Sequence, residues 1–434
     1  MRFTVKKCLV LAGMIWLTGC GLVDGTRTTE GVESDAGTIV FSEVTAAPSG
    51  TAVPAIYSNP TVAPTPEPTE VPTPEHTATP IPEITVVMVG DILLHTPLAE
   101  SGRKDDGSYD YTAVFANLKE EISAADLALV NQEVIIGGSE LGVSGYPTFN
   151  APYELGDSLV EAGFDVILHA TNHALDKRSK GLLNCIGFWK ENYPEVAVLG
   201  IHESQEDAED IYVYEQDGMR LAILNYTYGT NGISLPEDMP YAVDMLDNEA
   251  VAADLKRAEE LADFVIVCPH WGTEYVLEQT AVQEEWAQFL TENGADLILG
   301  THPHVIEPVE WVVPENRTDE EVASKNGALV YYSLGNFVNW TSGMGAGVAN
   351  RMVGAMAEVT ISRDADGQVV ITDYGVEPLV CHVESGFGGV TVYSLKEYTE
   401  GLAGKNEIVK QDANFSLQYC KELVNKVFGE IGNN

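Results

Sequence analysis

From residue 84 onward, apolar and polar positions follow two periods in turn. Short runs rich in β-branched residues predict buried strands, at Ile84–Val89, Leu127–Val130, Val166–Leu168, Val196–Leu199, Phe264–Val267, Leu297–Leu299 and Leu329–Tyr332. Amphipathic spacing between these runs predicts helices, at Val114–Ala124, Tyr153–Ala162, Gly181–Asn192, Asn248–Leu261 and Val282–Asn293. Strands that alternate with helices indicate an α/β fold with buried sheets.

Two Asp-Gly pairs interrupt this alternation. Asp217-Gly218 lies between the apolar runs 211–214 and 221–225, and Asp366-Gly367 lies between 352–361 and 369–374. Asp-Gly between two such runs is typical of a β-hairpin, so the sheets are predicted to be mixed. A last amphipathic segment, residues 415–428, predicts a helix that ends at Gly429.

The first twenty residues have the pattern of an export signal. Basic residues precede a short apolar segment that ends in Leu17-Thr18-Gly19-Cys20. This ending resembles a bacterial lipoprotein box, which implies cleavage before Cys20 and lipidation of its thiol. The alternative is a short anchor that stays uncleaved. We expect residues 1–19 to be a lipoprotein signal peptide and Cys20 to tether the protein to the membrane, on the extracellular face of the cell membrane.

Residues 20–83 are poor in large apolar side chains and end in a tract of Pro, Thr and Glu. Such a segment cannot bury enough apolar surface to fold, and proline favours extended backbone. We therefore predict a disordered stalk over residues 20–83. It would hold a folded part, residues 84–434, away from the membrane.

Net charge and cysteine content argue against two classes of protein. Lys and Arg number 23 against 66 Asp and Glu, which gives a net charge of −43 and argues against nucleic acid as a partner. Six cysteines in 434 residues are too few for a disulfide-based scaffold. Four of them lie in the predicted folded part, and spacing leaves open whether any pair: Cys185, Cys268, Cys381 and Cys420.

Polar residues gather just after predicted strands, where open α/β sheets bind ligands. Asp91 and Glu133 each follow a strand; taken alone, the first favours a helix cap over a metal ligand, and the second favours a solvated carboxylate. Asn172, His173 and Asp176 follow the strand Val166–Leu168 within one short loop. A hydrogen-bonded loop network is the alternative for these three.

Three histidines follow later strands. His270 comes after an apolar run, where a core histidine is the alternative to a metal ligand. His302 and His304 flank Pro303, which favours extended backbone at His302, so both imidazoles are expected to face one ion. Together these clusters predict a site for divalent metal ions. Nitrogen and oxygen donors suit Mn, Fe or Zn better than Ca or Mg.

Six motifs follow one another along the chain: Gly-Asp, Asn-x-Glu, Asn-His-x-x-Asp, His-Trp-Gly-x-Glu-Tyr, Gly-x-His-Pro-His and Tyr-Ser-Leu-Gly-Asn-Phe. In this order they resemble the CapA-type capsule, or poly-γ-glutamate biosynthesis, proteins, which resemble a branch of the calcineurin-like metallophosphoesterase superfamily. The resemblance covers residues 84–380 and leaves 381–434 as a partly helical C-terminal extension. It implies a four-layer α/β/β/α sandwich with one or two divalent metal ions between strand-end loops.

The resemblance carries metal-binding roles to six residues: Asp91, Glu133, Asn172, His270, His302 and His304. Asp91 and His304 would bind a first ion, Glu133 would bridge, and the other three would bind a second. It also implies catalytic roles for two further residues: His173, facing the leaving group, and Asp176, setting its tautomer. Leu93 departs from the superfamily, which has a metal-binding histidine there, and the role of Asn336 is left open.

The resemblance therefore implies a surface lipoprotein of capsule or poly-γ-glutamate biosynthesis or export, with a metal-dependent hydrolase-like domain. Its expected partners are polyglutamate synthase or export subunits, and an anionic polymer is the expected substrate. Because Leu93 removes a ligand, whether the domain is an enzyme stays open. The alternatives are a non-catalytic accessory subunit of a membrane synthase and a wall-associated phosphatase or amide hydrolase.

Overall fold

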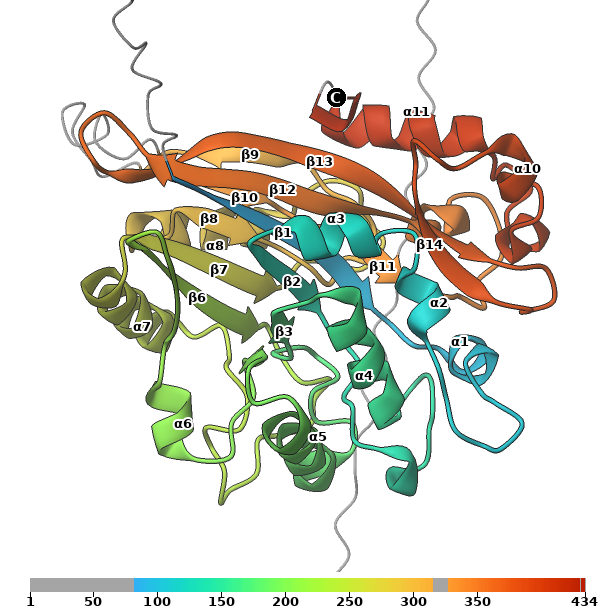
Figure 1. Ribbon diagram of the computed structural model, residues 1–434, viewed down its shortest axis with the longest axis horizontal. Helices are drawn as coiled ribbons and strands as arrows, with labels where there is room; N and C mark the ends of the chain where they lie inside the picture. The colour runs from blue at the N-terminus through green and yellow to red at the C-terminus, as the bar shows by residue number, and fades with distance from the viewer. Residues whose placement is uncertain (1–81, 315–326, 430, 434) are drawn as a thin grey trace, which may run out of the picture. The chain divides into compact units, whose positions relative to one another are not determined.

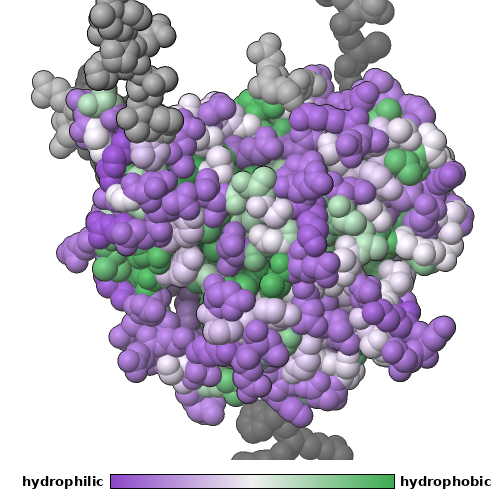
Figure 2. Space-filling model, in the orientation of Figure 1, coloured by the Kyte–Doolittle hydropathy of each residue, from purple (hydrophilic) through white to green (hydrophobic). Residues whose placement is uncertain are grey.

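The computed structural model describes residues 82–314, 327–429 and 431–433. The predicted signal peptide, Cys20 and almost all of the predicted stalk lie outside these residues. On the face seen in Figure 2, hydrophilic side chains cover most of the surface. Every helix in the described part of the chain is too short or too polar to cross a bilayer.

Two sheets form the centre of the fold (Figure 1). The first contains β1 (Glu83–Ile92), β2 (Leu127–Asn131), β3 (Val166–Leu168), β4 (Ala197–Leu199), β11 (Asn336–Val338), β12 (Val353–Arg363), β13 (Val369–Val383) and β14 (Val390–Ser394). Its order is β14-β13-β12-β1-β2-β3-β4, and β11 also pairs with β1. The second contains β5 (Tyr212–Gln216), β6 (Met219–Thr227), β7 (Phe264–His270), β8 (Leu297–Leu299), β9 (Val309–Val312) and β10 (Ala328–Tyr331). Its order is β5-β6-β7-β8-β10-β9.

Both sheets are mixed, as predicted. The strands β1 to β4 are parallel to one another, and so are β6, β7, β8 and β10. Both Asp-Gly pairs join antiparallel neighbours, β5 with β6 and β12 with β13. Because the carboxyl ends of parallel strands lie at one edge of a sheet, each sheet has one edge where several strand-end loops meet.

Side chains of the second sheet alternate between two cores. In β6, Leu221 and Ile223 belong to the large core shared with the first sheet, whereas Ala222 and Leu224 belong to a smaller one. The smaller core is completed by α7 (Asn248–Leu261) and α8 (Ala281–Glu292). On the other side, α4 (Tyr153–Ala162) buries Leu155 against the large core. The predicted α/β/β/α arrangement is therefore confirmed.

The other helices of the described residues are α1 (Thr96–Ser101), α2 (Thr112–Phe115), α3 (Lys119–Ala124), α5 (Arg178–Asn192), α6 (Gln205–Glu209), α10 (Glu400–Ala403) and α11 (Leu417–Phe428), with short 3-10 turns η1 (Ser139–Leu141), η2 (Val348–Met352), η3 (Glu407–Lys410) and η4 (Ile431–Asn433). The single helix predicted over 114–124 is wrong, because the chain forms α2 and α3 there. The predicted bounds of α4 and α7 agree with the structure.

The expected division between residues 380 and 381 falls inside β13. The residues beyond it pack in the same core as the sheets, through β14 and α11. All four cysteines of the described residues are free and buried. Burial raises the pKa of each of the four thiols.

Candidate metal centre

The structure brings all eight predicted site residues together, where the strand-end loops of both sheets meet. Each of their side chains is buried: Asp91, Glu133, Asn172, His173, Asp176, His270, His302 and His304. Burying so many polar groups costs free energy unless they pair with one another or with a ligand. The contacts within this cluster therefore decide what it can hold.

Asp91 lies inside β1 rather than after it, since the strand continues to Ile92 and pairs with β11 at Asn336. Its Oδ1 accepts a hydrogen bond from Asn131 Nδ2 at 2.8 Å, and its Oδ2 accepts one from the His302 backbone N–H at 3.2 Å. No helix begins here, so the helix-cap alternative is excluded.

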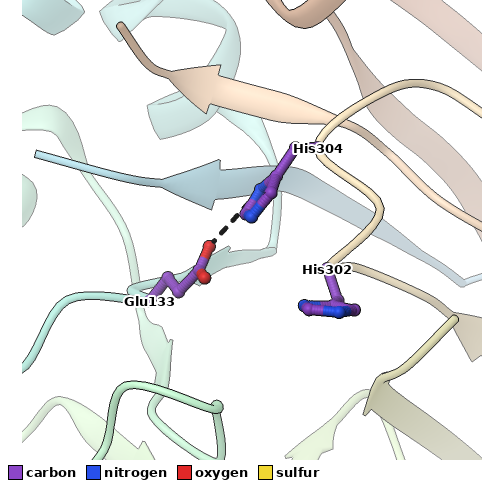
Figure 3. Close-up of side chains that lie close together, drawn as sticks. All are labelled: Glu133, His302 and His304. Atoms are coloured by element: carbon purple, nitrogen blue, oxygen red, sulfur yellow. Dashed lines mark ion pairs between the residues drawn. The ribbon is translucent and has the colours of Figure 1, made fainter. Parts of the chain in front are cut away.

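Glu133 follows β2 and points into the cluster (Figure 3). Its Oε2 lies 3.6 Å from His304 Nδ1, and its Oε1 lies 3.8 Å from His270 Nε2. Neither oxygen accepts a hydrogen bond from a described residue. Burial raises the pKa of Glu133 well above its usual range; the charge of His304 opposes this shift, and that of Asp91 adds to it.

His270 ends β7, with its two ring nitrogens in different surroundings. Nδ1 lies 3.0 Å from Thr301 Oγ1, and Nε2 lies 3.1 Å from Asn172 Oδ1. Asn172 in turn donates from Nδ2 to Asn231 Oδ1 at 3.4 Å, which leaves its own oxygen facing the cluster. Burial lowers the pKa of His270 well below its usual range, so the ring is neutral and able to bind a metal.

His302 and His304 follow β8 in a bend. The extended backbone predicted for His302 is wrong: its φ is 99°, and that of His304 is 59°. The Asp91 carboxylate accepts the His302 N–H, and this contact outweighs the local preference that Pro303 imposes. The expected convergence still holds, because ligand atoms of Glu133, His302 and His304 lie within 4.8 Å of one another.

These two histidines differ in protonation. Burial lowers the pKa of His304, but the charges of Glu133 and Asp91 outweigh it and raise the pKa to about 9. His304 Nδ1 lies 3.1 Å from Asp91 Oδ2. Burial lowers the pKa of His302 well below its usual range, and the charge of His304 adds to the effect. One proton therefore resides on His304 rather than on His302 near neutral pH.

His173 and Asp176 form a pair at the side of the cluster. His173 Nδ1 lies 2.7 Å from Asp176 Oδ2, and its Nε2 lies 3.9 Å from Glu133 Oε1. The ring of Phe149 meets the His173 ring edge-on at a centroid distance of 4.7 Å, and the Phe149 N–H donates to Asp176 Oδ2. These contacts fix the ring and direct Nε2 toward the cluster.

Sequence reasoning assigned no role to two amides that contact the cluster. Asn131 bonds Asp91, and Asn336 Oδ1 lies 3.1 Å from His304 Nδ1. Asn336 Nδ2 donates to the His304 and Arg351 carbonyls, so its oxygen must face the cluster. Both residues stand in the motifs, which was the available signal. Leu93 packs in the apolar core, as its side chain requires.

The cluster fits divalent metal ions. Both Glu133 oxygens and His302 Nδ1 are buried without a hydrogen-bond partner among the described residues, which is costly unless a ligand pairs with them. The Glu133, His302 and His304 atoms that converge are donors of the kind that transition metals and zinc bind.

Two curated relatives are similar over part of the chain. The PGA biosynthesis protein CapA of Bacillus subtilis (strain 168) is 33% identical over 189 residues, 42% of this chain and 45% of that protein. The capsule biosynthesis protein CapA of Bacillus anthracis is 32% identical over 201 residues, 44% of this chain and 45% of that protein. The matched region thus spans less than half the length of either relative.

Among solved structures, the NAD nucleotidase of Haemophilus influenzae aligns with a TM-score of 0.43 and 11% identity, over 80% of this chain and 63% of that one. A 5'-nucleotidase precursor of Thermus thermophilus aligns with a TM-score of 0.40 and 16% identity, over 69% and 54%. The family described as bacterial capsule synthesis protein PGA_cap matches residues 85–341, more than half of the chain. The chain therefore belongs to the PGA_cap family of bacterial capsule synthesis proteins.

Proposed function

We propose that this protein is a metal-dependent hydrolase of phosphoesterase type that acts in capsule or poly-γ-glutamate biosynthesis. The observation that carries the proposal is Glu133, a buried carboxylate whose two oxygens face different imidazoles and accept no hydrogen bond from a described residue. A divalent ion bound here would neutralise charge on the attacked group and lower the pKa of water.

The residues divide into two groups around Glu133. His304 lies on the Oε2 side together with Asp91, and Asn172 and His270 lie on the Oε1 side; Asp91 Oδ1 also lies 3.8 Å from His270 Nδ1. This division supports up to two ions, with Mn, Fe or Zn as the candidates because the donors mix nitrogen and oxygen. On the Oε2 side, Asn336 Oδ1 supplies the donor that Leu93 does not.

His173 supplies the proton for the leaving group. Asp176 Oδ2 accepts a hydrogen bond from His173 Nδ1–H, which leaves Nε2 on the side of the cluster. When the ring carries a second proton on Nε2, it can donate that proton to a departing oxygen or nitrogen and become neutral. Phe149 packs on one side of the ring, so the imidazole keeps this direction through the reaction.

We further propose that lipidated Cys20 holds the protein at the extracellular face of the cell membrane, with polyglutamate synthase or export subunits as partners. The Leu-Thr-Gly-Cys sequence after a short apolar segment supports the anchor. The two CapA relatives, a PGA biosynthesis protein and a capsule biosynthesis protein, support the pathway. Mass spectrometry of the N-terminal peptide from the producing cells tests the anchor: an unmodified Cys20 would refute it.

Metal analysis tests the hydrolase proposal. The full-length chain in detergent is expected to retain one or two Mn, Fe or Zn ions by inductively coupled plasma mass spectrometry, and to hydrolyse p-nitrophenyl phosphate or its diester. A His302→Ala/His304→Ala variant should lose both properties. Absence of metal after reconstitution would refute the proposal.

Buried Leu93 supports one second candidate, a non-catalytic accessory subunit. The superfamily ligand is replaced there by a side chain that packs in the core. Retained metal without turnover of any ester or amide tested would favour this candidate.

A further inference from the structure

One arginine lies beside the metal cluster without a carboxylate partner among the described residues. The guanidinium carbon of Arg351 lies 3.4 Å from the centroid of the Tyr275 ring, and the Tyr275 and His304 rings are 6.0 Å apart. The Tyr275 ring is thus a neighbour of both Arg351 and His304.

The guanidinium of Arg351 retains hydrogen-bonding capacity. Its Nη1 donates to Thr341 Oγ1 at 2.8 Å, and it forms no ion pair with a carboxylate of the described residues. By contrast, Arg220, Arg257 and Arg363 each pair with an aspartate. Stacking on Tyr275 occupies a face of the guanidinium and leaves N–H groups at its edge for an acceptor.

The acidic residue that precedes Tyr275 in the chain interacts with the tyrosine. Burial raises the pKa of Tyr275, and the interaction of its side chain with the Glu274 carboxylate adds to the shift. Both Glu274 and Tyr275 are exposed. Tyr275 therefore gives the arginine a flat support at an exposed position.

The backbone around Arg351 is held on two sides. From the metal centre, Asn336 Nδ2 donates to the Arg351 carbonyl at 3.0 Å. From the C-terminal part, Asp412 Oδ2 accepts the Gly347 N–H at 2.8 Å, and Gln411 Nε2 donates to the Thr341 carbonyl at 2.6 Å. A rigid support of this kind reduces the entropy lost when a ligand binds.

We propose that Arg351, stacked on Tyr275, is a substrate-binding residue that holds an oxyanion of the substrate, a carboxylate or a phosphate, beside the metal centre. The guanidinium fork matches the geometry of both groups. The proposal rests on the proposed function, since it assigns a substrate contact to that site. Arg351 lies after the family match, which ends at residue 341, whereas Tyr275, Asn336 and Thr341, which contact it, lie within the match. The oxyanion contact therefore comes from a residue outside the matched region that is supported by residues inside it.

Direct binding tests this assignment. Inorganic phosphate and γ-glutamylglutamate are titrated by calorimetry into the metal-loaded full-length chain, separately. We expect Arg351→Gln to weaken binding of at least one probe by about tenfold or more. The affinity of Arg351→Lys should lie between that of the parent and that of Arg351→Gln, because lysine keeps the positive charge but lacks the forked geometry of the guanidinium. The probe whose binding Arg351→Gln weakens identifies the bound group as a phosphate or a carboxylate.

A matched variant excludes a general charge effect. Arg178→Gln removes an exposed arginine at the start of α5 and should leave both affinities unchanged. Equal affinities of the parent and Arg351→Gln for both probes would overturn the proposal, as would weakening by Arg178→Gln alone. Unchanged metal content and thermal unfolding in Arg351→Gln show that the variant is folded.

Failure of this inference can be told apart from failure of the proposed function. If the chain turns over an ester and Arg351→Gln leaves KM unchanged, the oxyanion contact is refuted and the hydrolase stands. If no ester is turned over but probe binding still depends on Arg351, the hydrolase is refuted and the contact stands.

Discussion

At their carboxyl edges the two sheets contribute different side chains to one cluster. The first sheet supplies the carboxylates Asp91 and Glu133 and the loop after β3 that carries Asn172 and His173. The second supplies three imidazoles, His270, His302 and His304. Each carboxylate lies within 3.8 Å of a histidine of the other sheet.

This division shows why the site depends on the packing of the sheets. On one sheet alone, two buried carboxylates would lack cations, and three buried imidazoles would lack anions or a metal. Two buried glutamates illustrate the point. Glu133 faces imidazoles, whereas Glu307, after β8, accepts from Gln283 Nε2 at 2.6 Å and contacts no histidine in the described residues.

The largest expected effect comes from removing the charge of Glu133, the carboxylate that faces both groups of metal-binding residues. Glu133→Gln should lower metal affinity by about 100-fold or more, since the ligand facing both groups of donors is neutralised. Metal content after dialysis, by mass spectrometry, checks this. Glu307→Gln is the matched control and should keep its metal. Full metal content in Glu133→Gln would contradict the bridging role.

The next effect separates proton transfer from metal binding. His173→Ala and Asp176→Asn should each lower kcat by about 10²- to 10³-fold with metal content unchanged. His202, which pairs with Asp244 at 2.8 Å outside the cluster, gives the control: His202→Asn should keep its activity. If the His173 variant loses its metal as well, His173 is a ligand and the assignment is wrong.

Metal affinity should fall as pH falls. His304 has a pKa raised to about 9, so below that pH it carries a proton that must leave before the ring binds an ion. Affinity is expected to fall by about tenfold per pH unit for each proton displaced. Calorimetry in buffers of different ionisation enthalpy counts the released protons. Affinity that is constant from pH 6 to pH 8 would show that His304 is no ligand.

A smaller effect concerns the amide of Asn336. Asn336→Ala should weaken binding of the first ion by about tenfold, because Oδ1 of Asn336 faces His304. Asn339→Ala is the control, since Asn339 also donates to the Arg351 carbonyl but contacts no histidine in the described residues. Equal metal titrations for the two variants would remove Asn336 from the ligand set.

The last effect concerns stability alone. Burial raises the pKa of Glu307 to about 8, although the Gln283 hydrogen bond opposes it. Because the carboxyl pKa is higher in the folded than in the unfolded chain, the folded protein holds this proton more tightly. The contribution to the unfolding free energy is therefore complete below about pH 4.5 and is lost as pH rises toward 8. Relative to Glu307→Gln, the parent should lose up to about 1.4 kcal/mol of unfolding free energy per pH unit in this range. Urea unfolding at pH 5 and pH 8 measures it, with exposed Glu310→Gln as control.

The sequence by itself determined the elements and the residues of the cluster. The bounds of α4 and α7 followed from their periodic apolar positions, and Asp247 caps α7 with its side chain. The strand-end motifs identified all eight residues that the structure gathers, because parallel strands bring their carboxyl ends to one edge. These are local signals, which one segment carries alone.

Only the tertiary structure decided how these segments meet. β1 continues past Asp91 to Ile92 because β11, more than 200 residues later, pairs with it there. His302 adopts a positive φ because the Asp91 carboxylate, from the other sheet, accepts its N–H. Arg351 is held beside the cluster by stacking on Tyr275 and by the Asn336 amide, which donates to its backbone carbonyl. Each depends on contacts between residues far apart in the chain, which no local pattern of apolar and polar positions encodes.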